Sequence, residues 1–114
     1  MNKTFWWNGQ KFPFSAMEAE TMRNFVNETN NTSEALVDYE KSAGLDGSID
    51  ADGIIEECKI IDGFFNKILG EGTAEKIFKG YDLSERVAAF KKLARLRDRQ
   101  VKEFNDSVHA GLFE

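Results

Sequence analysis

The sequence contains few of the residues that build disulfides, metal sites and catalytic centres. Among 114 residues there is one cysteine, Cys58, one histidine, His109, and one proline, Pro13. A single cysteine cannot form a disulfide within the chain, and it cannot hold zinc by itself. Cys58 and His109 lie far apart in the sequence, and no spacing marks a pair of catalytic carboxylates. We therefore expect a protein that is not an enzyme and that holds no cofactor or metal.

Long apolar runs are missing, and basic residues are in the minority. No run approaches the roughly 20 apolar residues that cross a bilayer. The N-terminal stretch MNKTFWWNGQKF lacks the apolar core of a signal peptide. The net charge of −5 argues against a surface that binds nucleic acid throughout. The expectation is one soluble domain in a reducing cytoplasm, without a membrane partner.

Aromatic residues are abundant instead, with ten Phe and two Trp, and they indicate a hairpin over residues 1–14. The stretch TFWWNGQKFPF places Asn8-Gly9 between two aromatic runs, the strongest short-range signal for a two-residue turn. This turn pairs residues across the two strands: Trp7 with Gln10, Phe5 with Phe12, and Lys3 with Phe14. Side chains alternate along a strand, so four rings share one face, namely Phe5, Trp7, Phe12 and Phe14. Trp6 lies on the other face, near Lys11 and Pro13.

The remaining chain has the periodicity of helices over residues 15–104. Ser15 and Glu18 form a predicted capping box before a segment that continues to about residue 42. The polar insert NETNNTS leaves open whether this segment is one helix or two. A second helix, from about residue 53 to 69, has an apolar arc wider than half its circumference. We expect a mainly α fold: an N-terminal β-hairpin packed on a bundle of three to four helices, with a flexible tail over 105–114.

The last long helix, predicted from Asp82 and Glu85, combines an apolar seam with a basic run. The seam residues are spaced four-three-four as in helix pairs, with Arg97 interrupting the pattern: Leu83, Val87, Phe90, Ala94, Val101 and Phe104. The basic run KKLARLRDRQVK follows the first half of the chain, which is acidic. Such a face is solvated, or it meets an acidic partner that could be a second copy. A small nucleic-acid-binding regulator is the less favoured alternative.

Two loops resemble ligand motifs without completing them. In GEGTAEKIFKGY no lysine follows the second glycine and no strand precedes the first, so a phosphate loop is excluded. Gly70 is predicted to end one helix in a left-handed conformation, and Thr73 to cap the next. The segment DGSIDADGIIEE has the spacing of an EF-hand loop at Asp46, Ser48, Asp50, Asp52 and Glu57. Ala51 replaces its essential glycine, so we expect a solvated acidic loop in which Asp50 or Asp52 caps the following helix, with Cys58 buried beyond it.

The segment EECKIIDGFFNKILGEGTAEKIFKGYDLSERVAAFKKL resembles small proteins from the tail-morphogenesis region of long-tailed phages and prophages of Gram-positive bacteria. The similarity rests on three groups of residues: Asn8, Gly9, Gln10, Phe12 and Phe14; Phe64, Phe65, Gly70, Glu71, Gly72 and Thr73; and Lys76, Ile77 and Phe78. Proteins of that neighbourhood look like tail assembly chaperones. The resemblance implies binding to the tape-measure protein and the tail-tube protein in the bacterial host cytoplasm. A structural head–tail joining or tail-completion protein is the alternative.

Three sets of residues are candidates for partner binding under this interpretation. A groove along the second and last helices would use Ile60, Phe64, Val87 and Phe90, although the same residues could instead form the core. Trp6 stands apart from the packed face of the hairpin, and large rings of this kind are frequent in interfaces. Arg95 and Arg99 would contribute charge to assembly or partner binding, including formation of a homo-oligomer.

Overall fold

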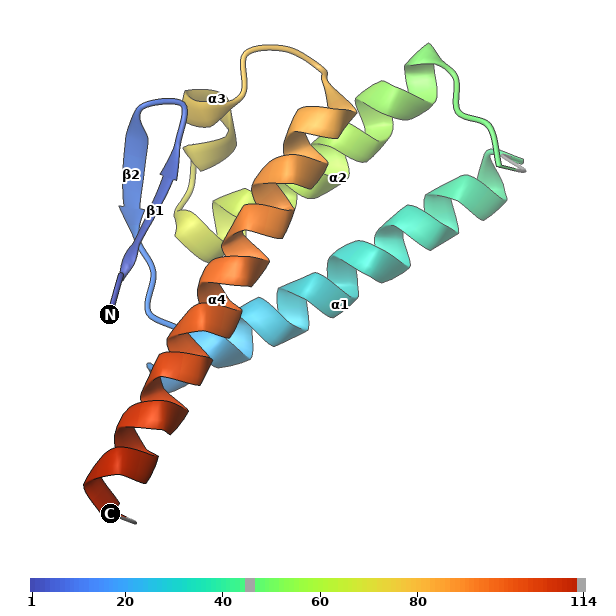
Figure 1. The fold of residues 1–114 in the computed structure, drawn as a ribbon. Helices are drawn as coiled ribbons and strands as arrows, with labels where there is room; N and C mark the ends of the chain where they lie inside the picture. Colours follow the sequence, from blue (N-terminus) through green and yellow to red (C-terminus); the bar gives the residue numbers. More distant parts are fainter. Residues whose placement is uncertain (45–46, 113–114) are drawn as a thin grey trace.

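The computed structural model describes residues 1–44 and 47–112. Over these residues a two-stranded antiparallel hairpin, β1 (Thr4–Trp7) and β2 (Gln10–Pro13), precedes four helices. The helices are α1 (Ala19–Ser42), α2 (Ala51–Leu69), α3 (Thr73–Ile77) and α4 (Leu83–Leu112). Figure 1 shows the hairpin on one side of the helices, with α4 crossing near the beginning of α1 and the two helices diverging from there. The predicted fold class is confirmed.

The hairpin has the predicted register. Phe5 pairs with Phe12 and Trp7 with Gln10, and the turn residues Asn8 and Gly9 have φ angles of 48° and 76°. Positive φ at both central residues gives the turn whose twist matches the strands, which is why Asn-Gly is favoured there. The side chain of Phe5 is buried, whereas that of Trp6 is 48% exposed. The face predicted to pack on the helices therefore does so.

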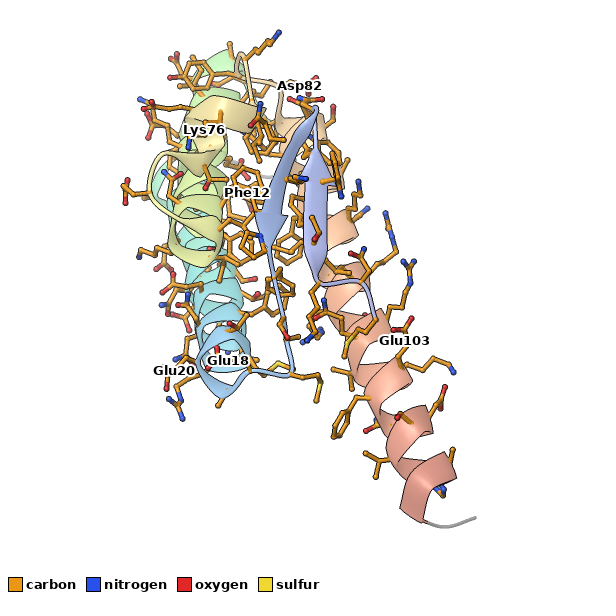
Figure 2. All side chains as sticks on the ribbon, turned by 90° about the vertical axis from the view of Figure 1, so that its left-hand side faces the viewer. Phe12, Glu18, Glu20, Lys76, Asp82 and Glu103 are labelled. Carbon is orange, nitrogen blue, oxygen red and sulfur yellow. The ribbon has the colours of Figure 1, made fainter. Side chains whose placement is uncertain are left out.

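The core lies between the hairpin and the helices (Figure 2), and aromatic rings make up much of it. Phe5 of the hairpin stacks on Phe65, 6.3 Å away between ring centroids, and the ring contacts among the helices are mostly edge-to-face. Phe65 lies 5.3 Å from Phe64 and 5.4 Å from Phe78 between ring centroids. Phe25 of α1 joins the same cluster, 6.0 Å from Phe64. Rings at such distances and angles add to the free energy gained by burial alone. Many of the abundant aromatic residues are therefore used inside the molecule.

Helix α1 is one continuous helix, and its start differs from the prediction. Glu18 is the N-cap, because its carboxylate accepts hydrogen bonds from the backbone N–H groups of Glu20 and Thr21 at 3.2 and 2.8 Å. The hydroxyl of Thr21 also donates to this carboxylate. That bond first, and then the two backbone bonds, lower the pKa of Glu18. Ser15 is not the cap, since residues 15–18 form a separate turn closed by a bond from Glu18 N–H to the Ser15 carbonyl.

The ends of α2 and α3 are set by side chains that the sequence only partly indicated. Asp50 caps α2 by accepting from Gly53 N–H at 2.8 Å. Gly70 ends α2 with a φ of 117° and a ψ of 151°, a conformation open to glycine but outside the left-handed helical region that was predicted. Thr73 is not the cap of α3. The side-chain oxygen of Asn66 takes that role by accepting from Ala74 N–H at 2.9 Å.

Helix α4 buries a different stripe from the predicted seam. Its buried residues are spaced three-four-three-four: Arg86, Ala89, Leu93, Leu96 and Gln100. The seam beginning at Leu83 lies on the flank of this stripe, toward α1. Residues 105–112 of the expected flexible tail are helical and continue α4, which projects past the hairpin beyond Glu103 (Figure 2); residues 113–114 lie outside the described residues. None of the described helices combines the length and apolar character needed to cross a membrane.

Candidate functional site: a groove between α1 and α4

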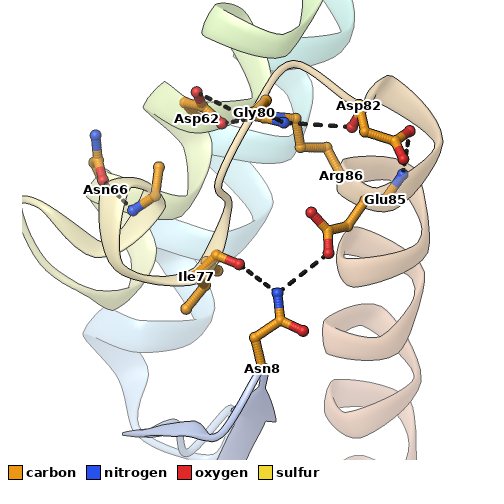
Figure 3. Close-up of polar contacts among 9 residues, drawn as sticks. Asn8, Asp62, Asn66, Ile77, Gly80, Asp82, Glu85 and Arg86 are labelled. Atoms are coloured by element: carbon orange, nitrogen blue, oxygen red, sulfur yellow. Dashed lines mark hydrogen bonds and ion pairs between the residues drawn. The ribbon is translucent and has the colours of Figure 1, made fainter.

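A buried arginine fixes the beginning of α4 against α2 (Figure 3). Arg86 is 3% exposed, and its Nε and Nη2 donate to the two carboxylate oxygens of Asp62 at 2.7 and 3.2 Å. Its Nη1 donates to the carbonyl of Gly80 at 2.6 Å, and its guanidinium lies 4.6 Å from the ring centroid of Phe78. Burial lowers the pKa of Arg86, but the hydrogen bond and charge of Asp62 outweigh it, so the guanidinium stays charged.

Two amides attach the hairpin to the helices. The Nδ2 of Asn8 donates to the carbonyl of Ile77 at 2.7 Å and to Glu85 Oε2 at 3.2 Å (Figure 3). Gln100, 1% exposed, donates from Nε2 to the carbonyls of Asn2 and Phe14 at 2.7 and 2.8 Å. Its Oε1 accepts from Ala16 N–H at 2.7 Å. These bonds hold one flank of α4 against the hairpin, so the other flank faces α1.

An apolar cavity of about 130 Å³ lies where α1 and α4 diverge over α2. Its wall comes from three helices: Thr29, Thr32, Ser33 and Leu36 of α1, Ile61 of α2, and Val87 and Phe90 of α4. We call this surface the groove. An open cavity of about 770 Å³ continues it, lined by Ile49, Ile54, Tyr81, Asp82, Leu83, Ser84, Val87, Ala88 and Lys91. Three apolar or aromatic side chains there are substantially exposed: Ile49, Tyr81 and Val87.

The groove ends in an acidic cavity of about 280 Å³ near the loop before α2. Its lining residues are Glu40, Gly47, Ser48, Ile49, Glu57 and Leu83. Glu57 is 7% exposed, and no hydrogen bond reaches its Oε2. Burial raises the pKa of Glu57, and the charge of Glu40 raises it further. A hydrogen bond between the two carboxyl groups, which needs one of them protonated, acts in the same direction.

Comparison with known protein families matches residues 8–110 to the Family of unknown function (DUF6673). The chain belongs to this family. The match runs from the hairpin turn through α1, α2 and α3 and nearly to the end of α4, so all the residues that line the groove lie within the DUF6673 region. No curated protein and no solved structure gives a significant match.

Within this DUF6673 fold, two of the four predicted groove residues line the groove and two do not. Val87 lines the groove and is 38% exposed, and Phe90 lines it while packing 5.2 Å from Phe64 between ring centroids. Phe64 itself is 1% exposed and belongs to the core, which is the alternative that the sequence left open for these residues. Its ring is enclosed by other aromatic rings. Ile60 is half-buried on α2 and is not among the residues that line these cavities.

The other predicted partner residues come together on the opposite flank of α4. Trp6, Arg95 and Arg99 line one cavity of about 350 Å³ with Asn2, Thr4, Phe5, Lys92 and Leu96. The ammonium of Lys92 donates to the carbonyl of Trp6 at 2.6 Å, and that of Lys11 lies 5.4 Å from a Trp6 ring centroid. This surface is cationic and aromatic, whereas the groove is apolar with an acidic end. Sequence alone did not indicate that the three residues are neighbours.

The burial of Arg86, Gln100 and Glu57 was not predicted, because polar side chains in helices were assigned to solvent and Glu57 was considered only within the EF-hand-like spacing. A helical projection of α4 with Leu93 and Leu96 at its centre would have placed Arg86 and Gln100 on the buried stripe. Cys58 is fully buried as predicted, and burial raises the pKa of its thiol. Asp46 of the EF-hand-like spacing lies outside the described residues. Among the residues that are described, no group of three or more His, Cys, Asp or Glu side chains is placed to hold a metal ion.

Proposed function

We propose that this chain is a phage tail assembly chaperone whose groove binds a helix of the tape-measure protein. The observation that carries the proposal is an apolar groove, formed by three helices, that no segment of the described chain fills. An amphipathic helix laid into an apolar groove is a common mode of peptide recognition. The resemblance of residues 56–93 to tail-morphogenesis proteins supports the choice of partner.

The groove suits the physical task of such a chaperone. An isolated tape-measure helix exposes long apolar stripes, which lead to aggregation unless they are covered. Val87 and Tyr81 would cover part of such a stripe and release it when tail-tube subunits compete for it. The exposed fractions of Val87 and Tyr81, 38% and 53%, leave these side chains accessible without unfolding the chain. Activity in the bacterial host cytoplasm is part of the proposal.

Co-expression with a fragment of the neighbouring tape-measure protein tests the proposal. We expect the chain to keep the fragment soluble and to co-purify with it. Val87→Glu should reduce recovery of the fragment at least fivefold, because a charge would enter the apolar wall. Val37→Glu is the matched control, since Val37 is also exposed on a helix, at 47%, but does not line the groove. Equal loss for both variants, or no co-purification, would contradict the proposal.

Mass spectrometry of finished particles separates this function from a joining or tail-completion role. A chaperone should be absent from the mature virion, whereas a joining protein remains in it.

A second candidate function, binding of an acidic partner or nucleic acid, is favoured by the cavity of Trp6, Arg95 and Arg99. It predicts binding of single-stranded DNA that weakens steeply with salt and is lost in the Arg95→Glu, Arg99→Glu double variant.

A further inference from the structure

Two of the three groove helices change from apolar to acidic, one helical turn toward the loop before α2. On α1 the step is from Leu36 to Glu40 and on α2 from Ile61 to Glu57, while α4 stays apolar from Val87 to Leu83. Each step covers four residues, which is about 6 Å along a helix. A helix lying in the groove would therefore meet an apolar section and then, one turn further, two carboxyl groups.

Among the described residues, the inner carboxyl group has one oxygen without a hydrogen-bond partner. Glu57 is more than nine-tenths buried, lines the acidic cavity and leaves Oε2 without a hydrogen bond. Other polar side chains buried to this extent are hydrogen-bonded, including Arg86 and Gln100. A buried polar atom without a partner destabilises the folded chain. Because the neighbouring side chain is another carboxyl, Glu40, a cationic group is the ligand that would satisfy both.

We propose that the acidic cavity binds the lysine or arginine side chain of the helix that occupies the groove. This inference rests on the proposed function and adds the chemistry of its partner: an apolar anchor followed, three or four residues away, by a basic residue. Arginine suits the site best, since its planar guanidinium donates to two carboxylates at once. The cation would replace the proton that the pair otherwise needs, and the partner would be held in one register and one direction.

Two synthetic amphipathic helical peptides test the inference on the full chain. Both carry the same leucine stripe; one places arginine four residues from the central leucine, and the other places glutamine there. Titration calorimetry should show at least tenfold tighter binding of the arginine peptide. The preference should disappear in Glu57→Gln and fall in Glu40→Gln, but persist in Glu75→Gln, a control at an exposed carboxylate of α3.

The possible failures are distinguishable. Equal binding of the two peptides would overturn this inference and leave the helix-binding function standing. Binding of neither peptide would overturn both, because the groove would then not take a helix. Sedimentation of the chain alone tests a different occupant: a dimer of the wild type that Glu57→Gln dissociates would mean that the basic side chain comes from a second copy. That result would overturn the assignment to a separate partner.

Discussion

Two buried polar side chains on opposite sides of α4, Gln100 toward the hairpin and Glu57 toward the groove, are hydrogen-bonded to different extents. On the hairpin side, Gln100 uses both ends of its amide, and at the start of the helix Arg86 donates to a carboxylate and a carbonyl. On the groove side, Glu57 is buried beside another carboxyl with one oxygen unpartnered. The first arrangement holds elements of the fold together. The second costs stability within the chain, and a cost of that kind is common where a protein binds something else.

Exposed apolar surface follows the same division. The packed face of the hairpin is closed by Phe5 and Phe14, each less than 5% exposed. The groove and its open continuation leave Ile49, Tyr81 and Val87 between 38% and 53% exposed. If the comparison is correct, substitutions on the hairpin side should reduce stability, whereas substitutions in the groove should affect binding first.

The largest loss of stability is expected for Arg86→Ala. The substitution removes the partner of Asp62, the bonds to the Gly80 and Asp82 carbonyls, and the contact with the Phe78 ring. Breaking a buried ion pair from one side costs about 3–5 kcal/mol, because the other charge is left uncompensated. Urea unfolding followed by circular dichroism measures the change. Arg95→Ala, an exposed arginine of the same helix, should change the free energy of unfolding by less than about 0.5 kcal/mol; a similar effect of both variants would remove the distinction.

The hairpin register could be predicted from the sequence, whereas the buried stripe of α4 could not. The hairpin register was predictable because the Asn8-Gly9 turn and the alternation of Phe5 and Trp7 both act over a few residues. The stripe of α4 was not, because Arg86 and Gln100 are polar at core positions and their partners Asp62 and Asn2 lie 24 and 98 residues away. The apolar seam from Leu83 was visible, but which flank of a helix is buried depends on tertiary contacts. The groove lies on the flank of α4 that those tertiary contacts leave uncovered.

A smaller loss is expected for Gln100→Ala. Ala16 N–H and the carbonyls of Asn2 and Phe14 would all lose their side-chain partner in the hairpin-to-helix joint. We expect about 2–3 kcal/mol, since buried groups left without a hydrogen bond cost on the order of 1–3 kcal/mol and these three share one site. Hydrogen exchange should show faster opening of the hairpin, with α2 less affected. Uniform destabilisation of both elements would mean that Gln100 is part of the general core rather than a joint.

The smallest effect, opposite in sign, is expected for Glu57→Gln. Burial and Glu40 hold the pKa of Glu57 above its ordinary value of 4.5, so the folded chain keeps a proton that the unfolded chain releases. The contribution of Glu57 is therefore most favourable below pH 4.5 and is lost as the pH rises through the raised pKa. Of the side chains lining the cavity, Glu40 of α1 is the other charged one, while α4 contributes Leu83 and the loop Ser48.

Glutamine removes this pH dependence and has an amide that donates to Glu40. At pH 7 the variant should be about 1 kcal/mol more stable than the wild type, and the difference should close as the pH falls toward 4.5. Urea unfolding of both proteins across pH 4 to 8 measures it, with Glu75→Gln as the control for removing a negative charge. A Glu57→Gln variant less stable than the wild type at pH 7 would mean that Oε2 of Glu57 already has a partner within the chain. The groove side would then be built like the hairpin side, and the acidic cavity would have no need of a cation from a partner.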